Sequence, residues 1–241
     1  FIAKEPFIAA GIRAVAAEVF VTQNPAITIT NTADDGANIS IGDVILVAQG
    51  PVVDLLQAER VALNLVQRLS GIATLTNRFA AAVSPLPVKI VDTRKTTPGL
   101  RVLEKYAVRV GGGHNHRFNL ADGVLIKDNH IAACGSIKAA VERAREQAPH
   151  TLKIEVEAEN ITQVEECLAC GVDIIMLDNM NPEQLREAVK IAKGKALLEA
   201  SGGVNLDNVR QIAETGIDII SIGALTHSAP AVDISMRLTT K

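Results

Sequence analysis

The chain has little aromatic character: among 241 residues it contains five Phe, one Tyr and no Trp, although 48% of its residues are hydrophobic. An interior without large rings has to be filled by Ala, Val, Ile and Leu, the residues that α/β folds use for buried parallel strands. Long apolar runs are lacking too, since none approaches the roughly 18 residues that span a bilayer. The stretch Phe7–Val21 carries Arg13 and Glu18, which favours an amphipathic segment over a secretory signal. We therefore expect an α/β protein that lies outside membranes, in the cytoplasm.

Cysteine is scarce as well, and three residues cannot build a disulfide framework. An odd count favours a reducing compartment. Cys167 and Cys170 form a C-x-x-C motif, but they end a helical pattern over Asn160–Cys170 that Gly171 closes, and no second pair completes a zinc site. We interpret them as small residues on the core side of a helix, in preference to a redox or metal role. The sequence assigns no role to Cys134.

Basic charge is not a general property of the chain, whose net charge is −3, but it is concentrated in one segment. Residues 92–130 hold three of the five His, and seven Lys or Arg against four acids. The seven are Arg94, Lys95, Arg101, Lys105, Arg109, Arg117 and Lys127. A local positive site in a slightly acidic protein favours a small, multiply charged anion, whereas a nucleic acid needs a broader basic stripe. We expect no nucleic-acid partner.

From residue 86 onward, short apolar runs rich in β-branched residues alternate with helical patterns. Ser136 precedes one helix and Asn181-Pro182 precedes another, as helix-capping residues do. A further helix is expected to open at Asn205 and to close at Gly216. This alternation with short links predicts parallel strands joined by right-handed crossovers. The expected strands are Val88–Asp92, Gly123–Lys127, Leu152–Ala158, Val172–Leu177, Ala196–Ala200 and Ile217–Ile222.

Polar residues recur at the ends of these strands with nearly constant spacing. Asp178 follows Glu157 by 21 residues, Glu199 comes 21 residues later, and Ser221 another 22. In a β/α barrel, the carboxyl ends of successive strands converge on one mouth, where the active site is built. Any one of these residues is also explained as a solvated loop residue. Four in register favour an α/β barrel with its site at this mouth.

The first 85 residues follow a different pattern. Three short strands are expected there: Pro6–Ala10, Ala26–Thr30 and Val44–Gln49. A long helix follows from Val52 to Leu69, breaks at Gly71 and resumes to Val83. A biotinyl- or lipoyl-type carrier is disfavoured, because it needs a lysine at a hairpin tip and none lies between Glu5 and Lys89. We expect a small α/β domain over residues 1–85 and a barrel over residues 86–224.

The loop after the first barrel strand, residues 92–99, carries two adjacent cations. Arg94 offers a planar fork that matches a carboxylate, and Lys95 offers a compact charge that suits a phosphate. Neighbouring strand residues face opposite sides, so the two would share a target only if the turn twists them. A solvated loop is the alternative. The Thr-Thr-Pro-Gly turn that follows holds the segment stiffly and favours a binding role.

The Gly111-Gly-Gly113 segment permits a backbone bend that brings His114, Asn115, His116 and Arg117 to one place. Three consecutive glycines can also cradle a phosphate, although this signal alone is weak. A metal at His116 is disfavoured, because the neighbouring Arg117 repels a cation. We expect His116 to hydrogen-bond an anionic substrate.

Lys127 is expected inside the barrel or at its mouth, because an outward lysine would enter the helix layer. Glu157 and Asp178 are oxygen donors on neighbouring strands without His or Cys companions. Such a pair suits Mg²⁺ together with water and substrate phosphates. The alternative is that the two carboxylates neutralise Lys127 and Lys153 within the barrel.

Glycine loops end the last two strands, at Ser201-Gly202-Gly203 and Gly223-Ala224, and such loops are typical of the phosphate site of β/α barrels. The sequence has no nucleophile elbow, activated cysteine or dinucleotide fingerprint. Glycosyl transfer from a phosphorylated sugar needs positioning and charge neutralisation more than a covalent nucleophile. The pieces predict a site for carboxylates, a phosphate and a magnesium-complexed group.

Together these motifs resemble those of the quinolinate phosphoribosyltransferase family, whose enzymes are also called nicotinate-nucleotide pyrophosphorylases (carboxylating). The resemblance covers essentially the whole chain and is highly specific; it rests on Glu59–Asn64, Leu69–Thr74, Asp92–Arg101, Gly111–Arg117 and Leu125–His130. It implies a small amino-terminal α/β sandwich domain and an incomplete, open α/β barrel of parallel strands. It also implies a homodimer with shared active sites, in which residues 225–241 return to the first domain and that domain caps the partner's barrel.

The resemblance implies roles for individual residues as well. Quinolinate carboxylates would be held by Arg60 from across the dimer and by Arg94, His116, Arg117 and Lys127. Phosphoribosyl pyrophosphate and its Mg²⁺ would be contacted by Lys95, Glu157 and Asp178, and the 5′-phosphate by Ser201, Gly202, Gly203, Gly223 and Ala224. Thr93 joins this substrate-binding set. The expected catalytic residues are Lys95, Lys127, Glu157 and Asp178, of which Glu157 and Asp178 would bind Mg²⁺, partly through water and substrate.

The implied reaction is attack of the pyridine nitrogen on the anomeric carbon, loss of pyrophosphate, and loss of CO₂ to give nicotinate mononucleotide in de novo NAD biosynthesis. A cationic cage would offset the repulsion between two anionic substrates. One alternative is a paralogue that uses another aromatic acid, such as the homologue associated with molybdenum transport. Arg60, Arg117 and Lys127 argue against it, because a monocarboxylate would not need all three. The other alternative, a non-catalytic phosphate-binding barrel used for assembly, leaves the acidic pair at Glu157 and Asp178 unexplained.

One departure from the family pattern concerns the start of the chain. The family's first strand region is absent, so we expect an incomplete cap domain. The sequence also starts with Phe1 and not with Met, which predicts that the natural amino terminus has been trimmed.

Overall fold

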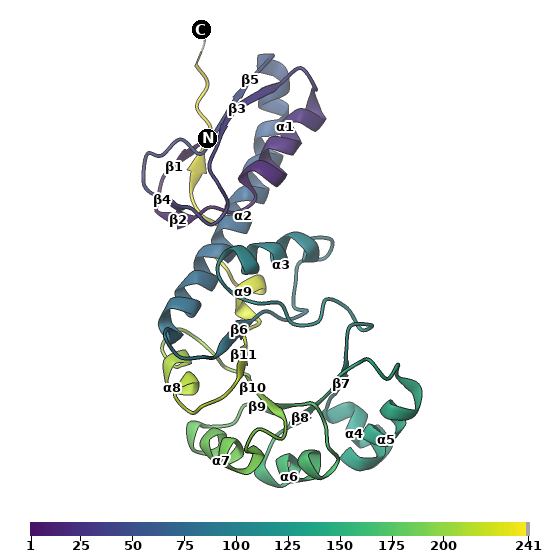
Figure 1. Ribbon diagram of the computed structural model, residues 1–241. Coiled ribbons are helices and arrows are strands. Elements are labelled where there is room, and N and C mark those ends of the chain that lie inside the picture. The colour runs from purple at the N-terminus through teal and green to yellow at the C-terminus, as the bar shows by residue number, and fades with distance from the viewer. Residues whose placement is uncertain (240–241) are drawn as a thin grey trace. The chain divides into compact units, whose positions relative to one another are not determined.

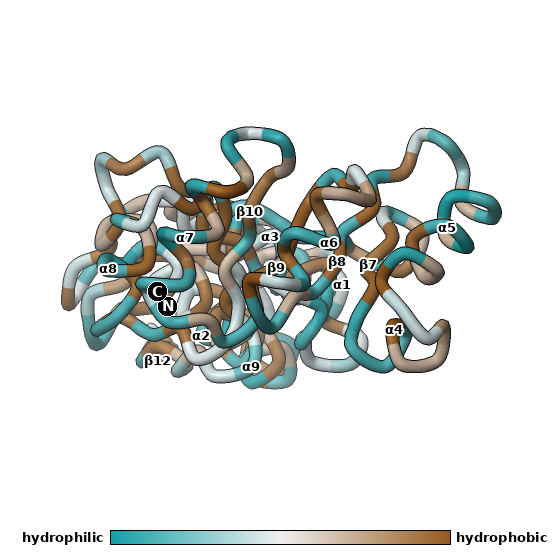
Figure 2. Tube along the Cα trace, turned by 90° about the horizontal axis from the view of Figure 1, so that it is seen from below, coloured by the Kyte–Doolittle hydropathy of each residue, from teal (hydrophilic) through white to brown (hydrophobic). Residues whose placement is uncertain are grey.

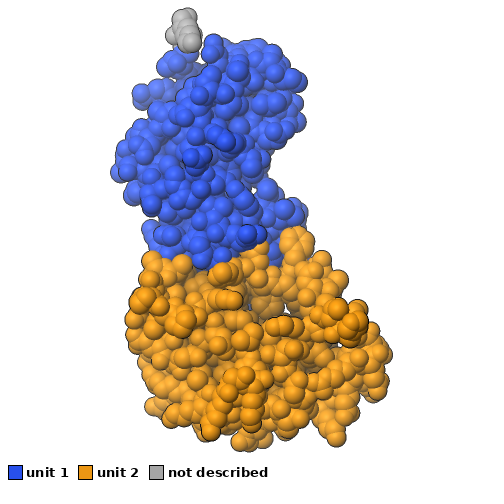
Figure 3. All heavy atoms as spheres, in the orientation of Figure 1, with its two compact units in different colours: residues 1–78, 95–113, 224–241 blue, residues 79–94, 114–223 orange. Residues whose placement is uncertain are grey.

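The computed structural model describes residues 1–239. By their internal packing these residues form two compact units (Figure 3). The first unit comprises residues 1–78, 95–113 and the described part of 224–241, and the second comprises residues 79–94 and 114–223. Relative to the domains expected from the sequence, residues 79–85 group with the second unit and residues 95–113 with the first. No helix in the described part of the chain is both long and apolar enough to cross a membrane.

The second unit is built on a six-stranded parallel sheet whose order is β6-β11-β10-β9-β8-β7. Its strands are β6 (Lys89–Val91), β7 (Val124–Ile126), β8 (Ile154–Ala158), β9 (Ile174–Asp178), β10 (Leu197–Ser201) and β11 (Ile219–Ser221). β6 and β7 lie at the two ends of the sheet and do not pair with each other, so the barrel is open. Figure 1 shows the strands inside an arc of helices. The open α/β barrel expected from the sequence is therefore confirmed.

Helices connect these strands and begin where capping residues stand. They are α4 (Asp128–Cys134), α5 (Ile137–Gln147), α6 (Ile161–Ala169), α7 (Pro182–Ala192) and α8 (Val209–Ala213). The side chain of Ser136 accepts a hydrogen bond from the third residue of α5, and Asn160 does the same for α6. Asn181 caps α7 in a reciprocal arrangement with Gln184. Asn205 acts as the predicted capping residue: its side-chain oxygen accepts the N–H groups of Asp207 and Asn208, and its carbonyl accepts the N–H of Val209, where α8 begins.

The two faces of the sheet differ in polarity because successive strand residues point to opposite sides. One face carries apolar side chains that are fully or almost fully buried, at Ile126, Val156, Ile175, Leu198 and Ile220. Helices α5, α6 and α7 pack against the strands that bear them. Figure 2 shows β7, whose three residues are Val, Leu and Ile, in the colour of hydrophobic residues. The other face lines the inside of the open barrel and carries the polar residues described below.

The loop before β7 also contributes to this sheet. His114 forms an isolated parallel bridge with Val91, the last residue of β6. Its N–H donates to the carbonyl of Ile90 at 2.8 Å, and its carbonyl accepts from the N–H of Asp92 at 3.2 Å. The backbone that leads into His116 and Arg117 is therefore fixed along the outer edge of β6.

The first unit contains three small antiparallel ladders. β1 (Ile2–Ala3) pairs with β12 (Ile234–Ser235), β2 (Phe7–Ile8) with β4 (Asn38–Ile39), and β3 (Thr28–Thr32) with β5 (Leu46–Gln49). Its remaining helices are η1 (Ile12–Ala17), α1 (Glu18–Gln23), α2 (Val52–Val83, which ends in the second unit), α3 (Arg101–Val110) and α9 (Ala224–His227). A core of small aliphatic residues and Phe7 and Phe20 fills it. The segment after α9 thus returns to pair with the first strand.

Helix α2 corrects one expectation from the sequence. It runs without a break over 32 residues, so the predicted interruption at Gly71 is wrong. A Cβ atom at Gly71 would lie 2.0 Å from the carbonyl oxygen of Pro230. Glycine is needed here because another backbone segment passes close to the helix, and the local helix-breaking tendency is overridden by that packing.

Candidate active site

The carboxyl ends of the strands in the second unit gather most of the predicted site residues. Asp178 and Ser201 are the last residues of β9 and β10 and lie in register with each other. Glu157 stands one residue before the end of β8, and Lys127 directly follows β7. Thr93, Arg94 and Gly223 lie in the loops just beyond β6 and β11. The predicted mouth of the barrel is therefore formed by residues from six strands.

Lys127 and Glu157 form an ion pair at this mouth, hereafter the mouth pair. Lys127 Nζ lies 2.7 Å from Glu157 Oε2. The lysine side chain is about half exposed and the glutamate mostly buried, at 48% and 11% of their full accessibility. An accessible cation next to a carboxylate can exchange that partner for an anionic ligand at little cost, since exposed ion pairs contribute little to stability.

Asp178 is held by the residue that follows it. Asn179 Nδ2 donates to Asp178 Oδ2 at 2.7 Å, and Asn179 adopts a positive φ of 54°. A Cβ atom on Gly202 would lie 2.2 Å from Asn179 Oδ1, so glycine is required in the loop after β10. Gly202 and Gly203 both have positive φ, at 93° and 61°. The loop predicted to hold the 5′-phosphate thus has a backbone that other residues rarely adopt.

Two guanidinium groups lie close together in the same unit. Burial and the positive charge of Arg94 both lower the pKa of Arg117. Arg117 Nη1 donates to the carbonyl of Gly123 at 2.9 Å, which fixes the direction of its side chain. Two neighbouring guanidinium groups repel each other unless an anion lies between or beside them. This pair is the part of the site best suited to bind a carboxylate.

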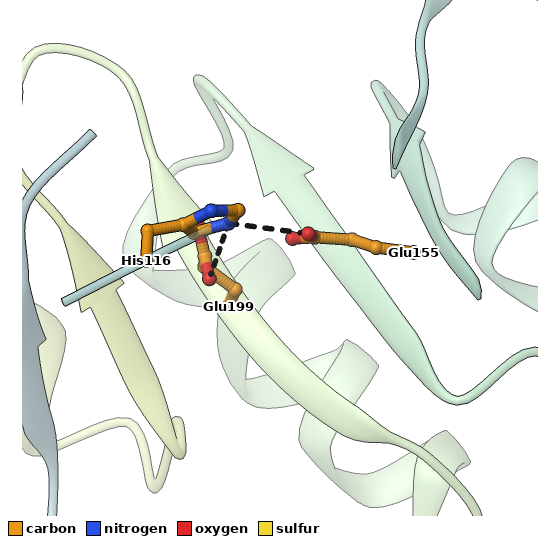
Figure 4. Close-up of side chains that lie close together, drawn as sticks. All are labelled: His116, Glu155 and Glu199. Atoms are coloured by element: carbon orange, nitrogen blue, oxygen red, sulfur yellow. Dashed lines mark ion pairs between the residues drawn. The ribbon is translucent and has the colours of Figure 1, made fainter. Parts of the chain in front are cut away.

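Beneath the mouth, His116 reaches two buried glutamates, and these three residues are hereafter the buried triad (Figure 4). His116 Nε2 lies 3.2 Å from Glu155 Oε2 on β8 and 3.6 Å from Glu199 Oε2 on β10. Burial lowers the pKa of His116, but the two carboxylates outweigh burial and leave that pKa raised. Burial and Glu155 raise the pKa of Glu199 from 4.5 to about 7. The triad therefore retains a proton more readily than isolated carboxylates would.

Three predicted residues lie in the first unit and are described there on their own. Arg60 is an exposed residue of α2, and its Nη2 is 3.8 Å from Glu59 Oε1. Lys95 has its carbonyl bound by the hydroxyl of Thr226 at 2.7 Å, close in sequence to Ala224 at the start of α9.

The turn after Lys95 is rigidly held. Arg68 Nη2 lies 2.6 Å from the buried Glu104 Oε1 and donates to Thr97 Oγ1 at 2.8 Å. Glu104 Oε2 accepts the N–H of Thr97 at 3.1 Å. The stiffness expected of the Thr-Thr-Pro-Gly turn therefore comes from a charged network in addition to its proline.

The glycines at 111 and 113 have a structural explanation. A Cβ atom on Gly111 would lie 2.3 Å from the carbonyl oxygen of Ala73, and one on Gly113 would lie 2.7 Å from Thr76 Cγ2. Both positions need glycine because helix α2 passes so close. This packing accounts for the glycines without a phosphate.

The chain matches two family models along nearly its whole length. Residues 1–70 match the amino-terminal domain of quinolinate phosphoribosyl transferase, and residues 72–237 match its carboxy-terminal domain. The chain belongs to the quinolinate phosphoribosyltransferase family. Among curated relatives, a probable nicotinate-nucleotide pyrophosphorylase [carboxylating] of Bacillus subtilis is 52% identical over 205 residues, which cover 85% of this chain and 71% of the relative. One of Synechocystis with the same name is 46% identical over 241 residues, covering 99% and 81%.

Solved structures of the family are close in fold. NadC from Streptococcus pyogenes has a TM-score of 0.94 at 46% identity, covering 98% of this chain and 83% of that one. The nicotinate-nucleotide pyrophosphorylase of Ehrlichia chaffeensis has a TM-score of 0.92 at 45% identity, covering 96% and 84%. The sandwich-plus-open-barrel architecture of the quinolinate phosphoribosyltransferases is thus the architecture of this chain.

Part of this site was not predicted from the sequence. Glu155 received no role, and Glu199 was noted at a strand end without one. The signal was present in the alternation Glu155-Val156-Glu157, because residues two apart on a strand share a face. Asp92 was also unassigned; it is fully buried, and its Oδ1 accepts the N–H of His116 at 2.9 Å.

Proposed function

We propose that the protein transfers the phosphoribosyl group of phosphoribosyl pyrophosphate to the nitrogen of quinolinate, with release of pyrophosphate and CO₂, to give nicotinate mononucleotide. The observation that supports this most directly is that Arg94 and Arg117 lie near enough to interact electrostatically, in the same unit as the accessible Lys127. These cations suit a ligand with adjacent carboxylates on a flat ring. Membership of the quinolinate phosphoribosyltransferase family supports the same substrate and reaction.

The cations of the site serve both steps of this reaction. In the transfer, the bond from the pyridine nitrogen to the anomeric carbon forms while the bond from that carbon to pyrophosphate breaks. Arg94, Arg117 and Lys127 hold the carboxylates and reduce the repulsion between two anionic substrates. In the decarboxylation, the electron pair of the broken carbon–carbon bond stays on the ring, where nearby positive charge stabilises it until a proton from solvent is taken up.

The remaining predicted residues bind the sugar donor. Lys95, Asp178 and Glu157 contact phosphoribosyl pyrophosphate, and Thr93, Ser201, Gly202, Gly203, Gly223 and Ala224 surround its phosphates. His116 serves the quinolinate side of this proposal through Arg117, because both of its ring nitrogens already face protein groups.

Glu157 and Asp178 are suited to hold Mg²⁺ with the pyrophosphate. They are hard oxygen donors at the ends of neighbouring strands, and each uses one oxygen in a 2.7 Å hydrogen bond while keeping a second oxygen for a ligand. Bound Mg²⁺ would neutralise charge on the leaving pyrophosphate. The two carboxylates would help to position the donor for in-line displacement by holding the cation that neutralises its pyrophosphate end.

Activity is tested by supplying the purified protein with Mg²⁺, phosphoribosyl pyrophosphate and carboxyl-labelled quinolinate. We expect release of labelled CO₂ in equal amount to nicotinate mononucleotide, and almost no product when nicotinic acid replaces quinolinate. Equal turnover of the two acids would contradict the substrate assignment and favour a paralogue that uses another aromatic acid. Binding of both substrates without any product would favour a non-catalytic phosphate-binding barrel.

A homodimer with shared active sites is part of this proposal. Helix α2 exposes four apolar side chains, Val52, Val53, Leu56 and Val61, each between 49% and 65% accessible, around the exposed Arg60. An apolar helix face of this kind suits a partner subunit. Subunits with Arg60→Ala and subunits with Glu157→Ala, each inactive alone, should regain activity when mixed. Verified mixed dimers without activity would exclude sharing. Three free cysteines fit a reducing compartment such as the cytoplasm.

A further inference from the structure

The buried triad joins elements that are not neighbours in the sheet. Glu155 lies on β8 and Glu199 on β10, with β9 between them, and His116 comes from the loop that follows the β6 edge (Figure 4). The glutamates are only 5% and 2% accessible. Oε1 of each glutamate is buried and has no hydrogen-bond partner within the described residues. A carboxylate pair this deep has a cost in desolvation that calls for a functional explanation.

A metal ion is the first explanation to consider, since one ligand atom from each residue lies within 4.8 Å of the other two. The second nitrogen of the imidazole argues against it. The N–H of Arg117 donates to His116 Nδ1 at 2.8 Å, so Nδ1 must carry a lone pair. In a metal-bound neutral imidazole the nitrogen away from the metal carries the proton and donates it. That proton would point at the N–H of Arg117.

The same hydrogen bond identifies which tautomer of the His116 ring is present. A neutral imidazole has one donor and one acceptor nitrogen, and Nδ1 is the acceptor here. The proton therefore stands on Nε2, which faces Glu155 at 3.2 Å and Glu199 at 3.6 Å. Two carboxylates so close together favour a ring nitrogen that donates and disfavour one that accepts. The glutamates thus select the tautomer that the Arg117 backbone requires.

His116 is consequently fixed at three points. The backbone N–H of His116 donates to Asp92 Oδ1 at 2.9 Å. Its ring Nε2 faces the two glutamates, and its ring Nδ1 accepts the backbone N–H of Arg117. The peptide between His116 and Arg117 cannot rotate without breaking one of these contacts. Because Arg117 lies beside Arg94, the orientation of this peptide determines where the paired guanidinium groups present their donors.

We propose that Glu155 and Glu199 are positioning residues, which hold the His116 imidazole with its proton on Nε2 and so fix the Arg117 guanidinium that binds the substrate. The first part of this inference concerns the ring alone. The second part rests on the proposed function, because it takes the substrate to be quinolinate. Neither glutamate touches the substrate in this account.

The tautomer is measured directly by nitrogen-15 NMR of protein labelled at its histidine rings. His116→Gln identifies the His116 signals by their disappearance. At a pH above the raised pKa values of His116 and Glu199, where the ring is neutral, we expect a bare Nδ1 and a protonated Nε2 in the wild type, unchanged by a chelator. In Glu155→Leu, which removes the nearer acceptor, we expect averaged tautomers. Glu155→Gln keeps an acceptor oxygen and should restore the wild-type pattern. A proton on Nδ1, a chelator-dependent signal, or a Glu155→Leu spectrum identical to wild type would overturn the proposal.

Kinetics separate positioning from general damage to the fold. For Glu155→Leu we expect the KM for quinolinate to rise at least tenfold, while kcat and the KM for phosphoribosyl pyrophosphate change less than threefold. Glu155→Gln should recover most of the loss. Glu159→Gln, an exposed glutamate just beyond β8, serves as the matched control and should leave all constants unchanged. An equal loss in both KM values would contradict the positioning role. If Glu155→Leu does not fold, the tautomer measured in the wild type decides the first part of the proposal. An absence of quinolinate turnover in the wild type would contradict the proposed function but would leave the assignment of the ring tautomer unaffected.

Discussion

Two glutamates on one strand show how depth in the barrel decides the use of a carboxylate. Glu155 and Glu157 stand two residues apart on β8 and share its inner face. The deeper one meets His116 and Glu199, where solvent is excluded. The shallower one meets Lys127, whose side chain is about half exposed. A move of two residues along the strand changes the partner of the glutamate from a buried imidazole to an accessible ammonium group.

This difference separates two kinds of contribution to the same site. The mouth pair is weakly bound and can exchange its partner, which suits direct contact with substrates that come and go. The buried triad lacks access to water, and its geometry can change only if the protein rearranges. Residues at the mouth should therefore affect catalysis with little effect on stability, and residues of the triad should affect both.

The largest effect is expected at the mouth. Glu157→Ala should lower kcat/KM by about 100-fold or more, because it removes a carboxylate that positions the sugar donor. Its free energy of unfolding should change by no more than about 1 kcal/mol, because the Lys127 side chain that loses its partner can be hydrated. Steady-state kinetics and urea unfolding check both halves. Destabilisation of several kcal/mol would show that the mouth and the triad are not separate.

A smaller effect, of a different kind, is expected in the triad. Burial and Glu155 raise the pKa of Glu199 from 4.5 to about 7 in the folded protein. Between these pH values the unfolded chain gives up a proton that the folded chain keeps, so the free energy of unfolding falls as pH rises. Glu199→Gln cannot ionise, and we expect its loss of stability from pH 5 to pH 8 to be smaller than that of wild type by roughly 2 kcal/mol.

Urea unfolding at the two pH values checks this prediction. Glu159→Gln gives the background of an exposed Glu to Gln change. Identical pH slopes for Glu199→Gln and wild type would mean that Glu199 is ionised in the folded protein near pH 5, and that the comparison between the two levels has to be revised.

The smallest effect is expected on the solvent-exposed surface of the helix layer. Lys138 and Glu142 form an ion pair on α5 with their charged atoms 3.8 Å apart and both side chains exposed. Lys138→Ala should change the free energy of unfolding by less than about 0.5 kcal/mol, since helix-surface pairs contribute no more than that. Activity should stay within twofold of wild type. A larger loss of activity would indicate that ion pairs far from the mouth also influence the site.

Most of the barrel could be predicted from the sequence because its signals are local. The strand at Leu152–Ala158 and the capping residues Ser136 and Asn181 act through neighbours in the chain, and the structure confirms them. The error at Gly71 has a different cause. Glycine has a local helix-breaking tendency, but this position is decided by the backbone segment at Pro230, which adjacent residues do not reveal.

The site shows the same limit. Arg94, Arg117 and Lys127 could be found from the sequence because cations cluster in one segment of a chain that is acidic elsewhere. The role of Glu155 could not be found in this way: the alternation Glu155-Val156-Glu157 places it on the same face as Glu157, but its function depends on a partner. That partner, His116, lies in a loop far away in the chain. The resemblance to a family implies roles for residues at the mouth, whereas the residues that support them from below become evident only in the folded structure.

The bridge between His114 and Val91 gives the loop that carries Arg117 a second, structural role. An open sheet exposes the backbone groups of its terminal strands, and such an edge invites pairing with other chains. The His114 backbone occupies those groups on β6. A single-residue insertion between Gly113 and His116 would therefore have two effects. It would change the direction of Arg117, and it would expose the backbone groups at the edge of β6 to pairing with other chains.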